Sequence, residues 1–331
     1  MNFSAVTHTY ARFPVVLRLF LLVIFLIITA GVGMHFIEPE TFPTVFEGVW
    51  WAIVTASTVG YGDYAPKTTF GRLLAFLVIM FGIGVVSIFV TSLASSAITT
   101  RNSFIHGELA FKKESHYVVI GWNERAKNMI LHLQKLDPRL HIVLVDKTLK
   151  QCPLNDSFIH FIRGNPLEDL TLKRANIEKA DTVIITANLH GNETESDAAT
   201  IITLIAIKGL NPTIYSIVEI LTPEQKNNCI RAGADEIIET SLLSSLAMVN
   251  STLYHGITSV IYQLLDHQND HMLLYDKIPN HFTGKTLSEA TLSYEDNHKL
   301  IIGIRSQSEI HLHPASTYQI KEGDQFIVIR R

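Results

Sequence analysis

The sequence predicts a protein of two parts, an all-α membrane part followed by a cytosolic α/β part with a Rossmann-like, doubly wound parallel sheet. Three observations lead to this prediction. Two long apolar segments lie within the first hundred residues, and a glycine-containing loop, Thr58–Asp63, lies between them. From residue 116 onward, short apolar strands alternate with helical patterns, which is typical of a parallel sheet covered by helices. A small α/β lobe is expected at the C-terminal end.

The two apolar segments are long enough to cross a bilayer. After Arg18 the first segment, Val15–Phe36, carries no charge before Glu38, and as a helix it would be about 33 Å long. It is longer than a typical signal sequence and has no obvious cleavage site, so we expect it to be retained. The second segment, Phe70–Ile98, contains a single charge near its start. The apolar stretch between them, Phe46–Ser57, is too short to span and is predicted to be a re-entrant helix.

The loop after this short helix has the residues of a potassium selectivity filter. Successive backbone carbonyls of such a loop, with a threonine hydroxyl at its base, replace the hydration shell of K⁺. Glycine is needed because alternate residues must adopt a positive φ to turn every carbonyl toward one axis. One ion is surrounded by four copies, so the motif predicts a homotetramer in the lipid bilayer, with residues 1–98 as the pore domain. The filter residues are Thr58, Val59, Gly60, Tyr61, Gly62 and Asp63.

The distribution of charge predicts the orientation in the membrane. Basic residues lie before the first span and after the second, whereas the loops on the filter side are mainly acidic. We therefore expect a multi-pass protein of the cell membrane with both termini in the cytoplasm. The basic residues are Arg12, Arg18, Arg101, Lys112 and Lys113, and the acidic ones are Glu38, Glu40, Glu47 and Asp63.

The second part begins after a polar linker, residues 99–115. Six apolar strands are predicted within residues 116–240, separated by helical patterns, as in the doubly wound dinucleotide-binding fold. The only two cysteines, Cys152 and Cys229, lie in this cytosolic part and are expected to be reduced. The predicted strands are 116–120, 141–145, 158–163, 182–187, 213–219 and 236–239.

The turn Gly121–Ala126 is a degenerate form of the phosphate-binding fingerprint of this fold. Gly121 retains the tight turn, but Asn123 stands where a second glycine would let the backbone approach a pyrophosphate. Asp146 ends the second strand, where an acid can bind ribose hydroxyls. An adenine nucleotide or NAD(H) is one interpretation, and a purely structural turn is the other. The candidate binding residues are Gly121, Trp122, Asn123, Glu124, Arg125, Asp146, Lys147, Gly164, Asn165 and Thr186.

Three segments, Val118–Asn123, Arg163–Pro166 and Ile230–Ile238, resemble the regulator-of-potassium-conductance (RCK, TrkA-N/TrkA-C) domain. With the pore, the chain resembles prokaryotic two-transmembrane potassium channels typified by the archaeal calcium-gated channel. The resemblance implies a helix-turn-helix crossover at 241–266 and a TrkA-C-like lobe at 267–331. It also implies RCK domains paired into an octameric gating ring, in which additional soluble RCK subunits could take part.

This resemblance leaves the ligand open. The calcium-binding positions of the family correspond here to Thr186, Ile217 and Glu219, so only one carboxylate is left for a cation that needs six to eight oxygens. Calcium is therefore the alternative, and a nucleotide or dinucleotide is the favoured ligand.

The second span contains the candidate gating hinge, Gly82 and Gly84. The resemblance implies that the inner helix bends at Gly82. Close packing of helices through small residues is the alternative for these glycines.

A membrane-tethered NAD-dependent oxidoreductase is a remote alternative, because it leaves Thr58–Asp63 unexplained and lacks a convincing catalytic pair. We expect no enzymatic activity and no nucleic-acid partner.

Overall fold

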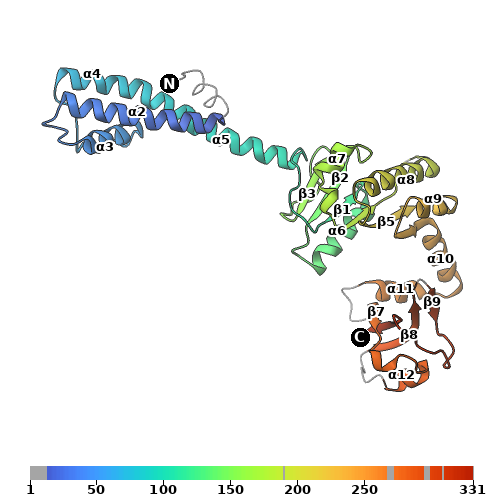
Figure 1. Ribbon diagram of the computed structural model, residues 1–331. Coiled ribbons are helices and arrows are strands. Elements are labelled where there is room, and N and C mark those ends of the chain that lie inside the picture. Colours follow the sequence, from blue (N-terminus) through green and yellow to red (C-terminus); the bar gives the residue numbers. More distant parts are fainter. Residues whose placement is uncertain (1–12, 189–190, 267–271, 294–298, 308, 331) are drawn as a thin grey trace. The chain divides into compact units, whose positions relative to one another are not determined.

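The computed structural model describes residues 13–188, 191–266, 272–293, 299–307 and 309–330 (Figure 1). It divides into two compact units that meet between Ile105 and His106. Arg12, which the orientation argument uses, and residues 267–271 and 331 of the predicted C-terminal lobe lie outside the described residues.

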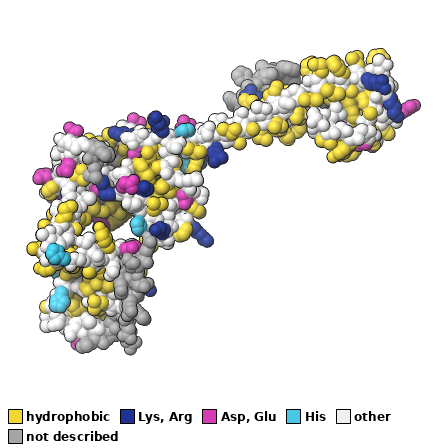
Figure 2. Space-filling model, turned by 180° about the vertical axis from the view of Figure 1, so that it is seen from behind, with side chains coloured by type: hydrophobic (Ala, Val, Ile, Leu, Met, Phe, Trp, Pro, Cys, Tyr) yellow, Lys and Arg dark blue, Asp and Glu magenta, His cyan; other side chains and the backbone are white. Residues whose placement is uncertain are grey.

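The first unit has two helices that are long and apolar enough to cross a membrane, with mean hydropathies of 2.8 and 2.9. Hydrophobic side chains cover much of the surface of these helices that is visible in Figure 2. Between the two spans lies a shorter apolar helix, as the sequence predicts. The elements are α2 (Val15–Ile37), α3 (Val45–Ala56), α4 (Thr69–Leu77), η1 (Val78–Gly82) and α5 (Ile83–Ile105).

Helices α2 and α3 pack closely because glycines face each other at their contact. A Cβ atom on Gly48 would lie 2.2 Å from the carbonyl oxygen of Gly31, and one on Gly31 would lie 2.5 Å from the backbone nitrogen of Val49. The buried side chains of Met34 and Phe42 form the core of this unit together with others from α2, α3 and α4.

The second span is interrupted by a π-helix. Residues Val78–Gly82 form η1, so the α-helical pattern of α4 ends there and resumes in α5. A π-helical turn accommodates an extra residue and is frequent at functional sites. The interruption ends at Gly82, the residue at which the family resemblance implies a hinge.

The second unit contains a six-stranded sheet in which every strand pair is parallel. The strand order is β3-β2-β1-β4-β5-β6, which is the classic doubly wound order. The predicted fold class is therefore confirmed. The strands are β1 (Tyr117–Ile120), β2 (Ile142–Asp146), β3 (Ile159–Arg163), β4 (Thr182–Ile185), β5 (Tyr215–Ile220) and β6 (Glu236–Glu239).

Helices cover both faces of this sheet, and each face has its own core. One core includes buried residues of α6 (Glu124–Leu136), and the other includes residues of α7 (Asp169–Arg174), α8 (Glu193–Leu210) and α9 (Lys226–Arg231). Strand residues point alternately to the two faces, so Val118 lies in one core and Val119 in the other.

Two helices, α10 (Thr240–Leu253) and α11 (Ile257–Leu265), follow the sheet, joined by a turn with Gly256 at φ +90°. The described residues after α11 include a four-stranded antiparallel sheet in the order β7-β10-β8-β9 and helix α12 (Leu287–Ser293). Its core includes Phe282, Ile304 and Phe326. The strands are β7 (Met272–Lys277), β8 (Lys299–Ser306), β9 (Glu309–Leu312) and β10 (Gln325–Arg330).

The segment predicted as a polar linker is helical up to Ile105, and its remainder is bound along the sheet domain. We call residues 107–115 the strap. The carbonyl oxygen of Gly107 accepts from the Arg163 backbone N–H at 2.9 Å, and that of Leu109 is 2.8 Å from Nε2 of His160. The Phe111 N–H donates to the Arg174 carbonyl at 2.8 Å. The strap is therefore an ordered part of the second unit.

Candidate functional site

The filter loop has the backbone conformation that carbonyl coordination requires. Thr58, Gly60 and Gly62 have φ values of 60°, 59° and 76°, so every second residue from Thr58 is left-handed. The base of the loop is held by α3, since the N–H groups of Val59 and Gly60 both donate to the carbonyl of Val54 at 3.2 and 3.3 Å. Alternation of this kind turns successive carbonyls toward the same side, which suits coordination of a dehydrated cation.

A tryptophan of the short helix braces the outer end of the filter. The indole Nε1 of Trp50 donates to Oδ2 of Asp63 at 2.8 Å, and its ring stacks on Tyr61 with centroids 6.2 Å apart. The neighbouring Trp51 is buried and packs edge-on against Phe42. The Trp50 side chain therefore connects α3 to the filter by one hydrogen bond, to Asp63, and by one ring stack, on Tyr61.

Glu38 holds the segment that follows the filter loop, and sequence reasoning used it only as an outer-face charge. Its carboxylate accepts from the N–H of Lys67 at 2.9 Å, from the N–H of Thr68 at 2.6 Å and from the hydroxyl of Thr68 at 2.5 Å. Only 4% of Glu38 is exposed. A Cβ atom on Gly71 would lie 2.1 Å from Glu38 Oε1, so this glycine makes room for the carboxylate. The carboxylate connects the end of α2 to the start of α4.

The second candidate site lies at the switch point of the parallel sheet, between the carboxyl ends of β1 and β4. In open α/β sheets, ligands bind where the strand order reverses. Gly121 follows β1 with φ +89°, and a Cβ atom there would be 2.8 Å from Oγ1 of Thr186, which follows β4. Only glycine fits at this close approach.

Asn123 caps helix α6 and connects it to β4. Its side-chain oxygen accepts from the Ala126 N–H at 2.9 Å, and its Nδ2 donates to Thr186 Oγ1 and to the Ala187 carbonyl, both at 3.2 Å. The first N–H groups of a helix carry partial positive charge and suit an anion. The asparagine that degrades the sequence fingerprint thus acts as a structural cap.

Asp146, at the end of β2, holds the turn after β1. Its Oδ2 accepts from the Trp122 N–H at 2.9 Å, while Oδ1 accepts from the N–H groups of Thr148 and Leu149 and from the Thr148 hydroxyl. A carboxylate offers about four acceptor positions. A ribose hydroxyl would therefore have to replace one of these donors.

Arg125 and Glu219 form an ion pair across the switch point. Arg125 Nε lies 2.7 Å from Glu219 Oε1, and one terminal guanidinium nitrogen donates to Oε2 at 3.0 Å. The Glu219 side chain is 8% exposed and the Arg125 side chain 33%. Glu219 also accepts from the Ala187 N–H at 2.8 Å and from the Thr240 hydroxyl at 2.6 Å. Four segments of the domain meet at this carboxylate.

The other predicted binding residues are distributed around this edge. Glu124 and Lys147 are exposed. Gly164 donates its N–H to the Asp146 carbonyl at 3.2 Å, and Asn165 accepts from the Leu167 N–H in its own turn at 3.3 Å. Thus the structure brings the Gly121–Arg125 turn together with Asp146, Thr186 and Glu219, whereas the Asn165 side chain is engaged locally.

The residues at the family's calcium position do not fit a divalent cation. Of Thr186, Ile217 and Glu219, only the last is a carboxylate, and Arg125 already binds it. Within the described residues there is no group of three or more His, Cys, Asp or Glu side chains arranged to hold a metal. The guanidinium of Arg125 provides the positive charge next to this carboxylate.

Three family models match the chain in succession. Residues 21–98 match an ion channel model, residues 117–240 match the TrkA-N domain, and residues 241–331 match a model described as Castor and Pollux, part of voltage-gated ion channel. The boundaries of the first two matches enclose the filter and the six-stranded sheet.

Two curated relatives align with most of the chain. A candidate potassium channel protein of Bacillus subtilis (strain 168), YugO, is 38% identical over 99% of this chain and 100% of its own length. The calcium-gated potassium channel TvoK of Thermoplasma volcanium is 25% identical, over 86% of this chain and 82% of its own.

Solved structures have the same fold. The GsuK channel aligns with 96% of this chain at a TM-score of 0.54 and 17% identity, and the human SLO3 gating ring aligns with 65% at 0.53 and 20% identity. The chain spans 57% of the GsuK chain and 44% of the SLO3 chain. With its filter, its two spans and its TrkA-N sheet, the chain belongs to the prokaryotic potassium channels that carry a C-terminal RCK domain.

Proposed function

We propose that the protein is a potassium-selective channel that works as a homotetramer in the cell membrane, with both termini in the cytoplasm. The observation that carries this proposal is the alternation of left-handed residues at Thr58, Gly60 and Gly62. One chain supplies a quarter of each ion site, so four copies are needed around the axis.

Flux through purified protein in liposomes tests the pore. Wild-type protein should pass K⁺ in preference to Na⁺, and Ba²⁺ should block the flux. In Gly60→Ala a side chain would be forced into a left-handed conformation at φ +59°, so selective flux should be lost. Equal Na⁺ and K⁺ flux through the wild type would contradict the proposal.

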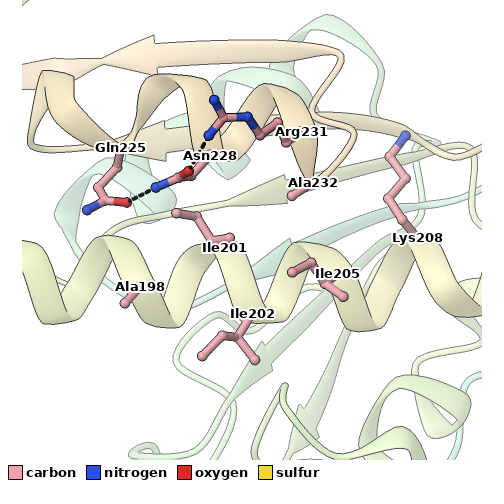
Figure 3. A pocket seen from close by; sticks show the side chains of 9 residues that line it. All are labelled: Ala198, Ile201, Ile202, Ile205, Lys208, Gln225, Asn228, Arg231 and Ala232. Atoms are coloured by element: carbon pink, nitrogen blue, oxygen red, sulfur yellow. Dashed lines mark hydrogen bonds between the residues drawn. The ribbon is translucent and has the colours of Figure 1, made fainter.

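Two apolar surfaces of the RCK domain support assembly into a gating ring. Helices α8 and α9 line a groove of about 550 Å³ (Figure 3), in which Ile202 and Ile205 are about half exposed. A second surface lies on α10, where Leu243, Met248 and Leu253 are exposed by 58% or more. Four pore domains around one axis bring four RCK domains together, so we propose that copies of this domain cover both surfaces. Further soluble RCK subunits would complete an octameric ring.

Crosslinking tests which surface pairs with a second copy. A cysteine at Ile205, in protein whose Cys152 and Cys229 are replaced by serine, should crosslink to a second domain. A cysteine at exposed Leu170 on α7, outside both surfaces, is the matched control. Equal crosslinking at both positions would contradict the assignment of the groove.

The ligand that we propose for gating is an adenine nucleotide or dinucleotide at Gly121–Arg125 and Asp146. This proposal is supported by the position of the turn at the switch point and by the Arg125 guanidinium beside it. A structure of the GsuK channel is described as bound to NAD, at 17% identity to this chain and a TM-score of 0.52.

Titration of the full-length channel with ADP, ATP, NAD and NADH should change the thermal midpoint of the protein and its K⁺ flux. If none of these changes either quantity, the turn is structural. Calcium is the second candidate, because the relative TvoK is described as calcium-gated. A response to Ca²⁺ that persists in Glu219→Gln would assign calcium to another site.

We propose that the pore opens by bending of the second span at Gly82. A Cβ atom on Gly82 would be 3.7 Å from the nearest side chain, and one on Gly84 would have no atom within 4 Å. Both positions therefore have room for the methyl group of alanine, so close packing within one chain does not require glycine at either position. The π-helix that ends at Gly82 supports a hinge there. Gly82→Ala should fold normally and reduce ligand-dependent opening.

We propose no enzymatic activity for the Rossmann-like domain. The relatives are named as potassium channels. Incubation with NADH and candidate carbonyl substrates should give no loss of absorbance at the nicotinamide band, and turnover there would contradict this proposal.

A further inference from the structure

We infer that Glu219 is an internal competitor for the ligand phosphate, and that release of its ion pair with Arg125 carries the binding signal to helix α10. This inference rests on the proposed nucleotide site and adds a regulation to it.

The first step is that Arg125 brings a guanidinium to the turn where we propose that a phosphate binds. It is the second residue of α6, next to the N–H groups that suit an anion. Its guanidinium donates to the Ala187 carbonyl at 2.9 Å and binds the Glu219 carboxylate. Guanidinium groups bind carboxylate and phosphate oxygens with the same two-pronged geometry. A phosphate at this turn and Glu219 would therefore compete for the same donors.

The second step is that Glu219 can lose Arg125 without losing all its partners. Its Oε2 also accepts from the Ala187 N–H, and its Oε1 accepts from the Thr240 hydroxyl. A buried carboxylate that loses its countercharge depends more strongly on its remaining hydrogen bonds. Phosphate binding at Arg125 would thus change the hydrogen bonds that Glu219 accepts from Ala187 and Thr240.

The third step is that Thr240 begins α10. A negative charge near the first turn of a helix interacts favourably with the helix dipole, and its neutralisation by a guanidinium weakens that interaction. Helix α10 carries the exposed apolar surface that we assign to pairing with another copy. The carboxylate therefore connects the ligand turn to the pairing helix through two direct contacts.

The competition is tested by ADP binding to the full-length channel. Glu219→Gln keeps an oxygen to accept hydrogen bonds but removes the charge that competes for Arg125. Its ADP affinity should rise by about tenfold, which corresponds to about 1.4 kcal/mol. Adenosine, which has no phosphate, should bind wild type and variant equally. Glu224→Gln, at an exposed position of η3 (Pro223–Gln225), changes the net charge equally and is the matched control.

Transmission is tested by a pair of variants at Thr240. Thr240→Val removes the hydroxyl that Glu219 accepts from, and Thr240→Ser keeps a hydroxyl. ADP should bind both variants, but the ADP-dependent change in K⁺ flux should be lost in the valine variant and retained in the serine variant. Equal flux responses in the two variants would overturn the transmission step.

The outcomes separate this inference from the proposed function. No ADP binding to wild type or Glu219→Gln would overturn both. Wild-type binding that Glu219→Gln leaves unchanged, or that Glu224→Gln strengthens equally, would keep the nucleotide site and overturn the competition.

Discussion

Replacement of Glu38 should loosen the outer mouth of the pore while leaving the rest of the fold intact. Its carboxylate accepts from three donors directly before the second span, namely the backbone N–H groups of Lys67 and Thr68 and the Thr68 hydroxyl. In Glu38→Gln, with the amide oxygen in the place of Oε1, both Thr68 donors keep their acceptor and the Lys67 N–H keeps the longer of its two contacts, at 3.1 Å. The amide NH₂ then replaces Oε2 and faces the Lys67 N–H, so the 2.9 Å hydrogen bond is lost. In Glu38→Ala all three donors lose their acceptor.

The magnitude follows from these contacts. A hydrogen bond to a charged acceptor contributes about 1.5–3 kcal/mol, and an unsatisfied buried donor costs about 1–3 kcal/mol. Lys67 and Thr68 are themselves exposed, so water can replace part of what is lost. We expect Glu38→Ala to destabilise this region by about 2–4 kcal/mol per chain and Glu38→Gln by about half of that.

Two measurements check this prediction, the thermal midpoint of the purified channel and the time course of K⁺ flux from liposomes. Both variants should have a lower midpoint, and their flux should decay during the record because the segment between the filter and the second span is no longer held to the end of α2. Glu40→Gln is the matched control, since Glu40 is exposed and lies two residues away with the same charge. A Glu38→Ala channel with wild-type midpoint and steady flux would refute the reasoning.

Three further changes have defined outcomes. Gly48→Ala should prevent normal assembly of the membrane part, as judged by the yield of folded protein, because the new methyl group would lie 2.2 Å from a backbone oxygen, whereas Gly209→Ala has open space and should be tolerated. Deletion of Ile79 should convert the π-helix to an α-helix and fix the gate in one state, as measured by flux with and without ligand, and a response like that of the wild type would contradict a role for the π-helix. Burial lowers the pKa of three histidines, His116, His141 and His160, below the ordinary 6.5. The positive charges of Lys113 and Arg174 lower the pKa of His141 and of His160 further. The negative charge of Asp181 partly offsets the lowering of the His116 pKa. When the strap detaches, these imidazoles become more exposed and the protein binds more protons, so attachment is strongest above about pH 6.5 and weakens as the pH falls. Amide exchange of residues 107–115, corrected for its intrinsic rate, should therefore become faster as the pH is lowered from about 7.5 to about 5.5.

The sequence predicts those parts of the structure that are encoded by neighbouring residues. The filter residues are contiguous, the spans are long uniform runs, and each strand of the sheet is a short apolar segment between turns. The order β3-β2-β1-β4-β5-β6 follows from the alternation of strands and helices, because parallel connections have one hand and form a small set of folds.

The contacts that sequence reasoning missed join residues that are far apart in the chain. Glu38 binds residues 29 and 30 positions away, and Arg125 binds a carboxylate 94 positions away. Nothing local distinguishes either acid from its neighbours, although an isolated acid directly after a long apolar run, as at Glu38, is a usable signal. The π-helix was missed for a different reason. In a span where nearly every residue is apolar, a change of helical period leaves no mark on the pattern.

The strap determines where flexibility between the gate and the ligand domain can lie. Helix α5 ends at Ile105, and the Gly107 carbonyl already accepts from Arg163, so at most two residues separate a continuous helix from a bound segment. A flexible linker would absorb a movement of the ring, whereas so short a connection passes it to the helix. The Phe111 ring, held among His116 and His160, opposes detachment of the strap further along. A movement that reaches α5 must then be taken up within the helix itself, and the interruption at Val78–Gly82 is where its hydrogen-bond pattern already changes. Insertion of a flexible Gly-Ser-Gly segment after Ile105 should therefore leave ligand binding unchanged and abolish the effect of the ligand on K⁺ flux. The same insertion after exposed Asn155, in the connection between β2 and β3, should retain both ligand binding and the effect of the ligand on flux.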